Sequence, residues 1–454
     1  MEKIKIKGYI TLSEKKYTFL YEKDRLSVLS CDEEYTILDY LKNITILEGI
    51  TTFHSRVLFM INKEVRYSNG YFETYPDYVI FINNNVKEVP IEIDAIKFEG
   101  GDITRFYTNK RIIENDIMDI PTTELKLKDP KETVSTEICN INGKEVKLEF
   151  SVSKPGFIYD GKIKFEDINS NLRIKYKSKV DYLMAIKDVD MIERLFKLAC
   201  VSSKYTFGKI DIEIMNEDKK YERIGNIYIP RMNQTSSIQN IFSYDFFEGK
   251  FNNLFNEIDK FEYIYEIISE RRKNKSNITE KDYVSAFSCF QILYNWFNSN
   301  VKKEVNEIEK DLNEIKKEII EELKKLDEKY KGVDSKKRKF INRFEELVGK
   351  SNVKLESNII KVINDHMYIF ERMHELYFEN KSKELLENIE DYVIDAVKDR
   401  DDITHNGIVE INEYSLIIYR SVVISCYIMI FEKLGINKEK IKDNIQRMIA
   451  HNAL

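Results

Sequence analysis

Proline, glycine, cysteine and tryptophan are scarce in this chain of 454 residues, which contains six prolines, 15 glycines, five cysteines and one tryptophan. Because proline and glycine interrupt regular elements, so few of them indicate long helices and strands joined by short loops. Hydrophobic residues make up 43% of the chain and aromatic residues 12%, which excludes a chain that is disordered throughout. At roughly 150 residues per domain, the length predicts two to four domains.

An excess of charge of one sign is also lacking. The chain has 72 basic and 78 acidic residues, so its formal net charge is only −6 although charged residues make up 33% of it. This balance excludes a protein that coats nucleic acid through a chain-wide positive field. Any nucleic-acid site must therefore be local.

The few cysteines exclude two further classes of protein. They are odd in number and widely separated, and no two have metal-ligand spacing, so neither a disulfide framework nor a zinc site is expected. The five are Cys31, Cys139, Cys200, Cys289 and Cys426.

Long hydrophobic runs are absent as well. The first residues, MEKIKIKGYITL, show no apolar stretch of signal-peptide length, and the longest apolar run, from Ser415 to Phe431, is interrupted by Arg420. That run is too short and too charged for a comfortable membrane span. We therefore expect a cytoplasmic protein that does not enter a membrane.

The sequence pattern predicts an α+β protein of several domains. Short alternating segments with turn signals at Asn83–Asn85, Gly100-Gly101 and Asn142-Gly143 predict a β-rich domain over 1–150, of sandwich or barrel-like form. Residues 151–235 mix strands with one helix and form the second half of this N-terminal module.

From residue 236 to residue 454 the hydrophobic period is helical, which predicts an all-α bundle. The expected helices cover 250–272, 279–299, 301–331, 336–348, 355–379, 382–404, 411–434 and 437–450.

The expected helix over 301–331 is long and highly charged. Its apolar residues alternate in steps of four and three before the repeat shifts, which is typical of a heptad seam. They are Val301, Val305, Ile308, Leu312, Ile315, Ile319, Leu323 and Leu326. Two interpretations stay open: a coiled coil within or between subunits, or one solvated helix with a core stripe.

Histidine and arginine come together in one segment, AVKDRDDITHNG. Arg400 and His405 stand five residues apart at the end of an amphipathic helix, Asn406-Gly407 supplies a left-handed stop, and an apolar helix follows from Ile411. If the helix frays at its end, both side chains can face one cleft. The plainer interpretation is structural, since cationic side chains in a last turn offset the helix dipole.

Carboxylates in the same helix offer a different chemistry. Asp391, Asp395, Asp399 and Asp402 recur at steps of three and four, so they could hold Mg²⁺ or simply form a solvated face. No two histidines have the spacing of a zinc motif, and His366 and His374 are expected on one half-buried helix.

The segment Arg400-Asp-Asp-Ile-Thr-His405 resembles the R-x4–6-H motif of HEPN-domain ribonucleases. With its two flanking helices and the β-rich region before them, the chain is similar in layout to the ApeA-like HEPN proteins of bacterial anti-phage defence. The layout covers nearly the whole chain, and the motif covers about ten residues. Family motifs often have Asn or His directly after the arginine, whereas this chain has Asp401.

The resemblance implies an endoribonuclease that needs no metal or other cofactor. The 2′-OH of RNA attacks the adjacent phosphate, histidine transfers the proton, and arginine holds the phosphate oxygens. Arg400, His405 and Asp401 would then be catalytic. Two motifs would pair across a homodimer or a higher homo-oligomer, with 382–404 and 411–434 near the interface.

Four nearby residues are expected to bind substrate: Lys398, Thr404, Asn406 and Arg420. Each has a plainer role as well: a surface lysine, two helix-capping residues, and a buried arginine paired with Asp401, Asp402 or another carboxylate. RNA is the expected partner, with tRNA as one candidate, and a phage-derived trigger is compatible with the layout. Two alternatives stay open: a non-catalytic HEPN-type binding or assembly protein, and a metal-dependent nuclease that uses the helix aspartates.

Overall fold

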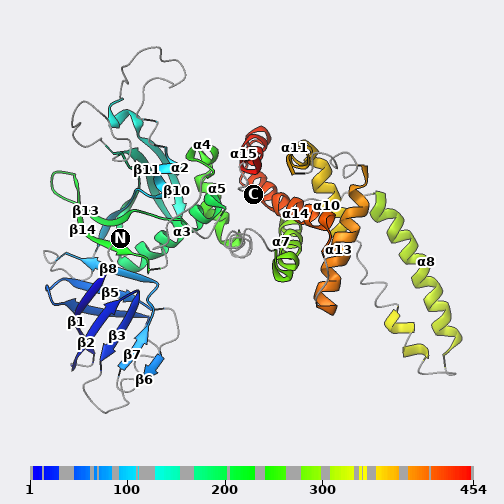
Figure 1. Ribbon diagram of the computed structural model, residues 1–454, viewed down its shortest axis with the longest axis horizontal. Helices are drawn as coiled ribbons and strands as arrows, with labels where there is room; N and C mark the ends of the chain where they lie inside the picture. Colours follow the sequence, from blue (N-terminus) through cyan, green and yellow to red (C-terminus); the bar gives the residue numbers. More distant parts are fainter. Residues whose placement is uncertain are drawn as a thin grey trace. The chain divides into compact units, whose positions relative to one another are not determined.

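The fold combines an antiparallel sheet with a helical region, as the α+β prediction required (Figure 1). The computed structural model describes residues 4–12, 15–29, 45–61, 66–68, 71–83, 92–108, 111, 128–153, 168–201, 205–230, 241–261, 278–297, 307–331, 337–339, 341–344, 354–377, 387–407 and 411–450.

The chain divides into two compact units. The first comprises Met1–Lys275 with Leu434–Lys440 and Arg447–Ala453, and the second comprises Ser276–Lys433 with Ile441–Gln446 and Leu454. The change of unit after Lys275 comes later than the expected change at 236, which falls in 231–240, outside the described residues.

The first unit is built on one sheet of fourteen described strands, in the order β10-β11-β12-β9-β13-β14-β8-β5-β4-β1-β2-β3-β7-β6. Every described pairing is antiparallel, and β9 lies between β12 and β13, so segments from both parts of the expected N-terminal module share the sheet. The strands are β1 (Lys5–Leu12), β2 (Lys15–Glu22), β3 (Arg25–Leu29), β4 (Ile46–Thr51), β5 (Arg56–Met60), β6 (Arg66–Ser68), β7 (Tyr71–Thr74), β8 (Tyr78–Ile82), β9 (Ile93–Glu99), β10 (Ser135–Ile141), β11 (Lys144–Val152), β12 (Ser170–Val180), β13 (Lys209–Met215) and β14 (Tyr221–Tyr228).

The turn signals had different outcomes. Asn142 and Gly143 both have positive φ, 50° and 77°, and they join β10 to β11 as the predicted hairpin. The prediction of a hairpin at Gly100-Gly101 was wrong: after β9 the chain enters the short helix α2 (Asp102–Phe106) instead. A Cβ on Gly101 would lie 2.3 Å from the backbone oxygen of Thr206, so the glycine permits a close approach of two segments. Asn84 and Asn85 lie outside the described residues.

The strands from β1 to β8 curl around an apolar core. Alternate side chains of these strands, such as Phe19, Tyr21 and Phe59, are fully buried together. Tyr228 in β14 donates a hydrogen bond of 2.9 Å to Asp24 in the turn between β2 and β3, although several strands separate β14 from β2 in the sheet order. The sheet therefore bends back on itself here.

The helix α3 (Tyr182–Cys200) lies in the other half of this unit, where its apolar side chains are buried. Asp181 caps the helix by accepting from the Met184 N–H. Glu193 is fully buried, and its carboxylate accepts hydrogen bonds from Tyr78 and Tyr205 at 2.5 and 2.7 Å. These hydrogen bonds satisfy a buried polar group that would otherwise destabilise the fold.

Aromatic side chains connect this sheet to the short helices that follow it. Phe150 in β11 lies 4.8 Å from Tyr244 and 5.4 Å from Phe251, measured between ring centroids. These helices are α4 (Tyr244–Phe247), α5 (Phe251–Glu257) and the 3₁₀ helix η6 (Ile258–Phe261), whereas the 3₁₀ helix η3 (Pro130–Thr133) comes earlier, just before β10.

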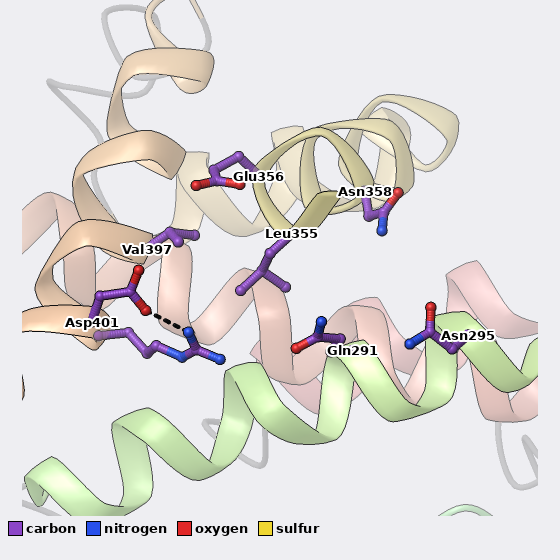
Figure 2. Close-up of a pocket in the computed structure, with 8 residues that line it drawn as sticks. Gln291, Asn295, Leu355, Glu356, Asn358, Val397 and Asp401 are labelled. Atoms are coloured by element: carbon purple, nitrogen blue, oxygen red, sulfur yellow. Dashed lines mark hydrogen bonds and ion pairs between the residues drawn. The ribbon is translucent and has the colours of Figure 1, made fainter. Parts of the chain in front are cut away.

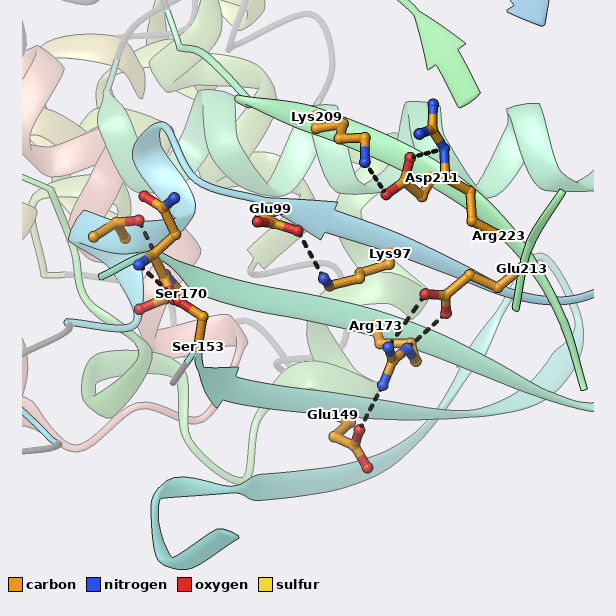
Figure 3. A network of polar contacts seen from close by, with 12 residues as sticks. Lys97, Glu99, Glu149, Ser153, Ser170, Arg173, Lys209, Asp211, Glu213 and Arg223 are labelled. Atoms are coloured by element: carbon orange, nitrogen blue, oxygen red, sulfur yellow. Dashed lines mark hydrogen bonds and ion pairs between the residues drawn. The ribbon is translucent and has the colours of Figure 1, made fainter. Parts of the chain in front are cut away.

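One face of the same sheet carries a ladder of alternating charges (Figure 3). Arg173 on β12 bonds Glu213 on β13 at 2.7 Å and Glu149 on β11 at 3.3 Å. Asp211 on β13 is paired with Arg223 at 2.9 Å. The Arg173–Glu149 and Asp211–Arg223 pairs join neighbouring strands, and the Arg173–Glu213 pair spans β9, so opposite charges support the strand register.

The second unit is helical. Its helices are α7 (Glu280–Phe297), α8 (Glu307–Lys329), α10 (Lys354–Asp365), α11 (Met367–Tyr377), α13 (Ile389–Asn406) and α14 (Glu413–Lys433), and α15 (Lys438–Ala450) contributes residues to both units. α14 packs against α7, α10 and α13. Almost all of its side chains from Ser415 to Phe431 are buried.

α14 is also the one helix among the described residues that is long and apolar enough to cross a membrane. Within its most apolar window, 78% of the residues are buried against the rest of the protein, as in the core helix of a soluble protein.

Two expected helices differ from those observed. The helix expected over 355–379 is two helices, α10 and α11, separated at His366, so His366 and His374 do not share one continuous helix. The helix expected over 250–272 changes to 3₁₀ geometry at Ile258, and residues after Phe261 lie outside the description until residue 278.

The Thr279–Asp282 start of α7 is confirmed: the Thr279 hydroxyl accepts from the Asp282 N–H, and the Asp282 carboxylate accepts from the Thr279 N–H.

Candidate functional site

α13 carries all of the predicted motif residues in one unbroken helix. The Thr404 hydroxyl donates to the Arg400 carbonyl at 2.8 Å, and the Gly407 N–H reaches the Ile403 carbonyl at 3.2 Å. The helix ends at Asn406, and Gly407 follows with a φ of 84°, as the stop signal predicted. The end of the helix does not fray.

The unbroken helix separates Arg400 and His405. At 3.6 residues per turn, a spacing of five turns the side-chain direction by about 140° around the axis. His405 is exposed, and the side chain of Arg400 is 22% exposed. Within one chain the two side chains therefore face different directions and do not share a cleft.

Arg400 is held by its neighbour in sequence. One terminal nitrogen of its guanidinium donates to the carboxylate of Asp401, which is itself 51% exposed. The Nε of Arg400 is buried and makes no hydrogen bond to any described residue. The pairing with Asp401 uses one of the five N–H donors of this guanidinium.

A cavity of about 320 Å³ opens beside Arg400, between α7, α10 and α13 (Figure 2). Its polar lining includes three amide side chains, Gln291, Asn295 and Asn358, and the carboxylates of Glu356 and Asp401. Its apolar lining is Leu355 and Val397. His405 is not part of the lining.

Contacts to α7 and α14 fix the position of α13. Tyr283 on α7 donates to the Ala396 carbonyl at 3.0 Å, and burial raises the pKa of its hydroxyl well above the usual value. Ser415, in the first turn of α14, donates to Asp399 at 2.5 Å. The rings of Tyr392 and Tyr414 stack, with centroids 4.2 Å apart and planes 2° from parallel.

The other predicted site residues lie outside the cavity lining. Lys398 is exposed on α13, and the Thr404 hydroxyl is occupied by the backbone. The side chain of Asn406 lies outside the described residues. The prediction that Arg420 is buried was wrong: it lies on the one face of α14 that leaves the core and is exposed.

The helix aspartates do not gather. Asp399 is engaged by Ser415, and no group of three or more His, Cys, Asp or Glu side chains within the described ranges is arranged to hold a metal ion. His366 is buried at the break between α10 and α11, where it contacts the Val362 carbonyl at 2.9 Å and Glu432 at 3.0 Å. Both ring nitrogens of His366 are therefore engaged by contacts within the folded unit, which is typical of a structural histidine.

The cavity walls on α7 and α10 were not predicted from the sequence. Gln291 and Asn295 stand four residues apart, which places both on one face of α7. Amides on exposed helix faces are common, so nothing in the sequence distinguished these from other surface residues. Only the packing of α10 and α13 beside them defines the site.

Comparisons with known proteins do not assign the chain to a family: no family model matches it, no curated protein matches it, and no solved structure matches it.

Proposed function

We propose that the chain is a metal-independent endoribonuclease of the HEPN type that acts in anti-phage defence, cleaving RNA, with tRNA as one candidate substrate. The observation that carries the proposal is the placement of the motif on α13. Arg400 lines a polar cavity, and His405 stands exposed just before the helix ends at Gly407.

The residue chemistry suits this reaction. The imidazole of His405 can accept the 2′-OH proton or donate a proton to the leaving 5′-oxygen. The planar guanidinium of Arg400 can bind two phosphate oxygens and offset the charge that develops in the transition state. The products would be a 2′,3′-cyclic phosphate and a 5′-hydroxyl.

The angle between Arg400 and His405 supports a composite site. Since the two side chains point about 140° apart on one helix, a single copy presents them in different directions. Two copies with their α13 helices face to face could place the histidine of one beside the arginine of the other. The proposed active form is therefore a homodimer, in which each copy contributes part of the site.

The test is cleavage of purified total RNA by the full chain, with and without EDTA. His405→Asn removes the imidazole, and His54→Asn is the matched control, because His54 is exposed, lies in the first unit and has a positive φ that asparagine tolerates. We expect EDTA-resistant cleavage by the wild type and by His54→Asn, and none by His405→Asn. Intact RNA with every protein would contradict the proposal, and cleavage abolished by EDTA would indicate the aspartate alternative.

A second candidate is a non-catalytic HEPN-type binding protein. The pairing of Arg400 with Asp401 favours it, because a guanidinium already held by a carboxylate has a structural role. RNA that binds to the protein but stays intact would support this candidate.

A further inference from the structure

The chemistry of the cavity beside Arg400 differs from that of a phosphate site. One cation, Arg400, and two carboxylates, Glu356 and Asp401, line it, so its formal charge is −1. A site that binds only phosphate would carry net positive charge. The remaining polar groups are neutral amides, which carry both donors and acceptors.

Amides and carboxylates are the side chains that recognise the edges of nucleobases. An amide can form two hydrogen bonds to one base edge, and a carboxylate accepts from ring and exocyclic N–H groups. Leu355 and Val397, which are 7% and 3% exposed, add a small apolar surface for a base face. The cavity of about 320 Å³ is large enough for a single base.

The positions of the amides and of Arg400 also suggest where the base and the phosphate of a nucleotide would lie. Gln291, Asn295 and Asn358 lie on α7 and α10, on the side of the cavity away from Asp401, and Arg400 lies on α13. A base among the amides would leave its phosphate within reach of the guanidinium. RNA recognition commonly uses such unstacked bases.

We propose that this cavity binds one unstacked nucleobase of the RNA, with Asn358 and the α7 amides reading its edge and Arg400 holding the phosphate attached to it. The inference rests on the proposed function, since it names the part of the substrate that the same site selects.

Binding of the four nucleoside 3′-monophosphates to the full chain tests the subsite directly, with inorganic phosphate as the probe for phosphate alone. We expect one nucleotide to bind more tightly than the other three, and phosphate to bind most weakly. Asn358→Ala should reduce that preference by about tenfold, the size of one good amide-to-base contact. Asn364→Ala is the matched control, because Asn364 is exposed on the same helix and lies outside the cavity.

The outcomes separate the subsite from the catalytic proposal. Selective binding that Asn358→Ala weakens, together with RNA cleavage whose site preference the same variant flattens, supports both. Cleavage that depends on His405 but has the same base preference in Asn358→Ala and wild type overturns the subsite alone. Selective binding without any cleavage supports the subsite as a nucleotide site and overturns the nuclease. Nucleotides that bind no better than inorganic phosphate overturn the subsite.

Discussion

The hydroxyl of Ser415 donates to the carboxylate of Asp399 at 2.5 Å, joining the start of α14 to the segment of α13 that precedes Arg400. Ser415 is fully buried, and its own N–H donates to Asn412, which caps α14. Asp399 directly precedes Arg400 in the sequence. This contact therefore helps to fix the position of the helix backbone from which the Arg400 side chain extends. It links the core of the second unit to the candidate site.

Ser415→Ala should lower the free energy of unfolding by about 2 kcal/mol, because it leaves a partly buried carboxylate without a donor. Thermal unfolding should show a fall of roughly 2–4 °C per kcal/mol in a unit of this size. Ser425→Ala is the control, since Ser425 is equally buried on α14 and its hydroxyl has no hydrogen-bond partner among the described residues. Equal losses in both variants would show that the Asp399 contact contributes nothing.

Periodicity was enough to predict several of the helices. The expected helices 279–299, 411–434 and 437–450 are observed within about two residues at each end as α7, α14 and α15, because their apolar stripes and caps are local. The break at His366 was not predicted, and the Glu432 side chain that contacts this histidine is 66 residues away in the sequence. The order of strands in the sheet could not be predicted from local sequence, because β9 pairs with β12 and β13, which come much later in the chain.

The candidate site divides in the same way. The end of α13 at Gly407 and the helix that carries Arg400 could be predicted from the sequence, because both depend on residues close together in the chain. The exposure of Arg420 was not, since an apolar run does not reveal which face of α14 lacks a neighbour. The cavity forms only where three helices meet, so the sequence around its amide side chains did not predict that they line a site.

Asp188 gives the first unit a specific pH dependence. It is buried, accepts hydrogen bonds from Asn142 at 2.7 Å and Tyr176 at 2.8 Å, and has a pKa raised chiefly by burial, partly offset by those bonds. A raised folded-state pKa means that this group favours folding most below its unfolded pKa of about 3.9, and that the contribution is lost as pH rises through the folded pKa.

Asp188→Asn removes this titration. The melting temperature of the variant minus that of the wild type should therefore increase as pH rises from acid towards neutral, and then level off. Thermal unfolding across that pH range measures it. Asp218→Asn is the control, because Asp218 is exposed in the turn between β13 and β14. A difference that is the same at every pH would contradict the prediction.

The heptad seam on α8 makes a prediction about self-association. Ile315, Ile319 and Leu326 are 52%, 40% and 41% exposed, so this stripe is not a buried core stripe in a single chain. If it is an inter-subunit coiled coil, replacing Ile315 and Ile319 together by lysine should weaken the oligomer by more than about tenfold, as expected for charge at seam positions.

Sedimentation of the full chain over a range of concentrations measures this effect. The control is Lys317→Ala with Glu318→Ala, two exposed neighbours whose joint replacement leaves the net charge unchanged. An oligomer unaffected by the lysine variant would place the subunit contact elsewhere, with α13 and α14 as the next candidates.

Asp401 directly follows Arg400, and its carboxylate holds the Arg400 guanidinium. Under the proposed function, a phosphate must compete with this carboxylate, and the added negative charge repels it. Asp401→Asn should therefore raise kcat/KM for RNA cleavage several-fold, an effect of about 1 kcal/mol for a half-exposed charge. The increase should shrink at high salt, because screening weakens the repulsion in the wild type. Asp395→Asn removes the same charge from an exposed position on the same helix and should leave the rate unchanged. If Asp401→Asn instead abolishes cleavage while Asp395→Asn does not, the carboxylate orients Arg400 for catalysis rather than restraining it.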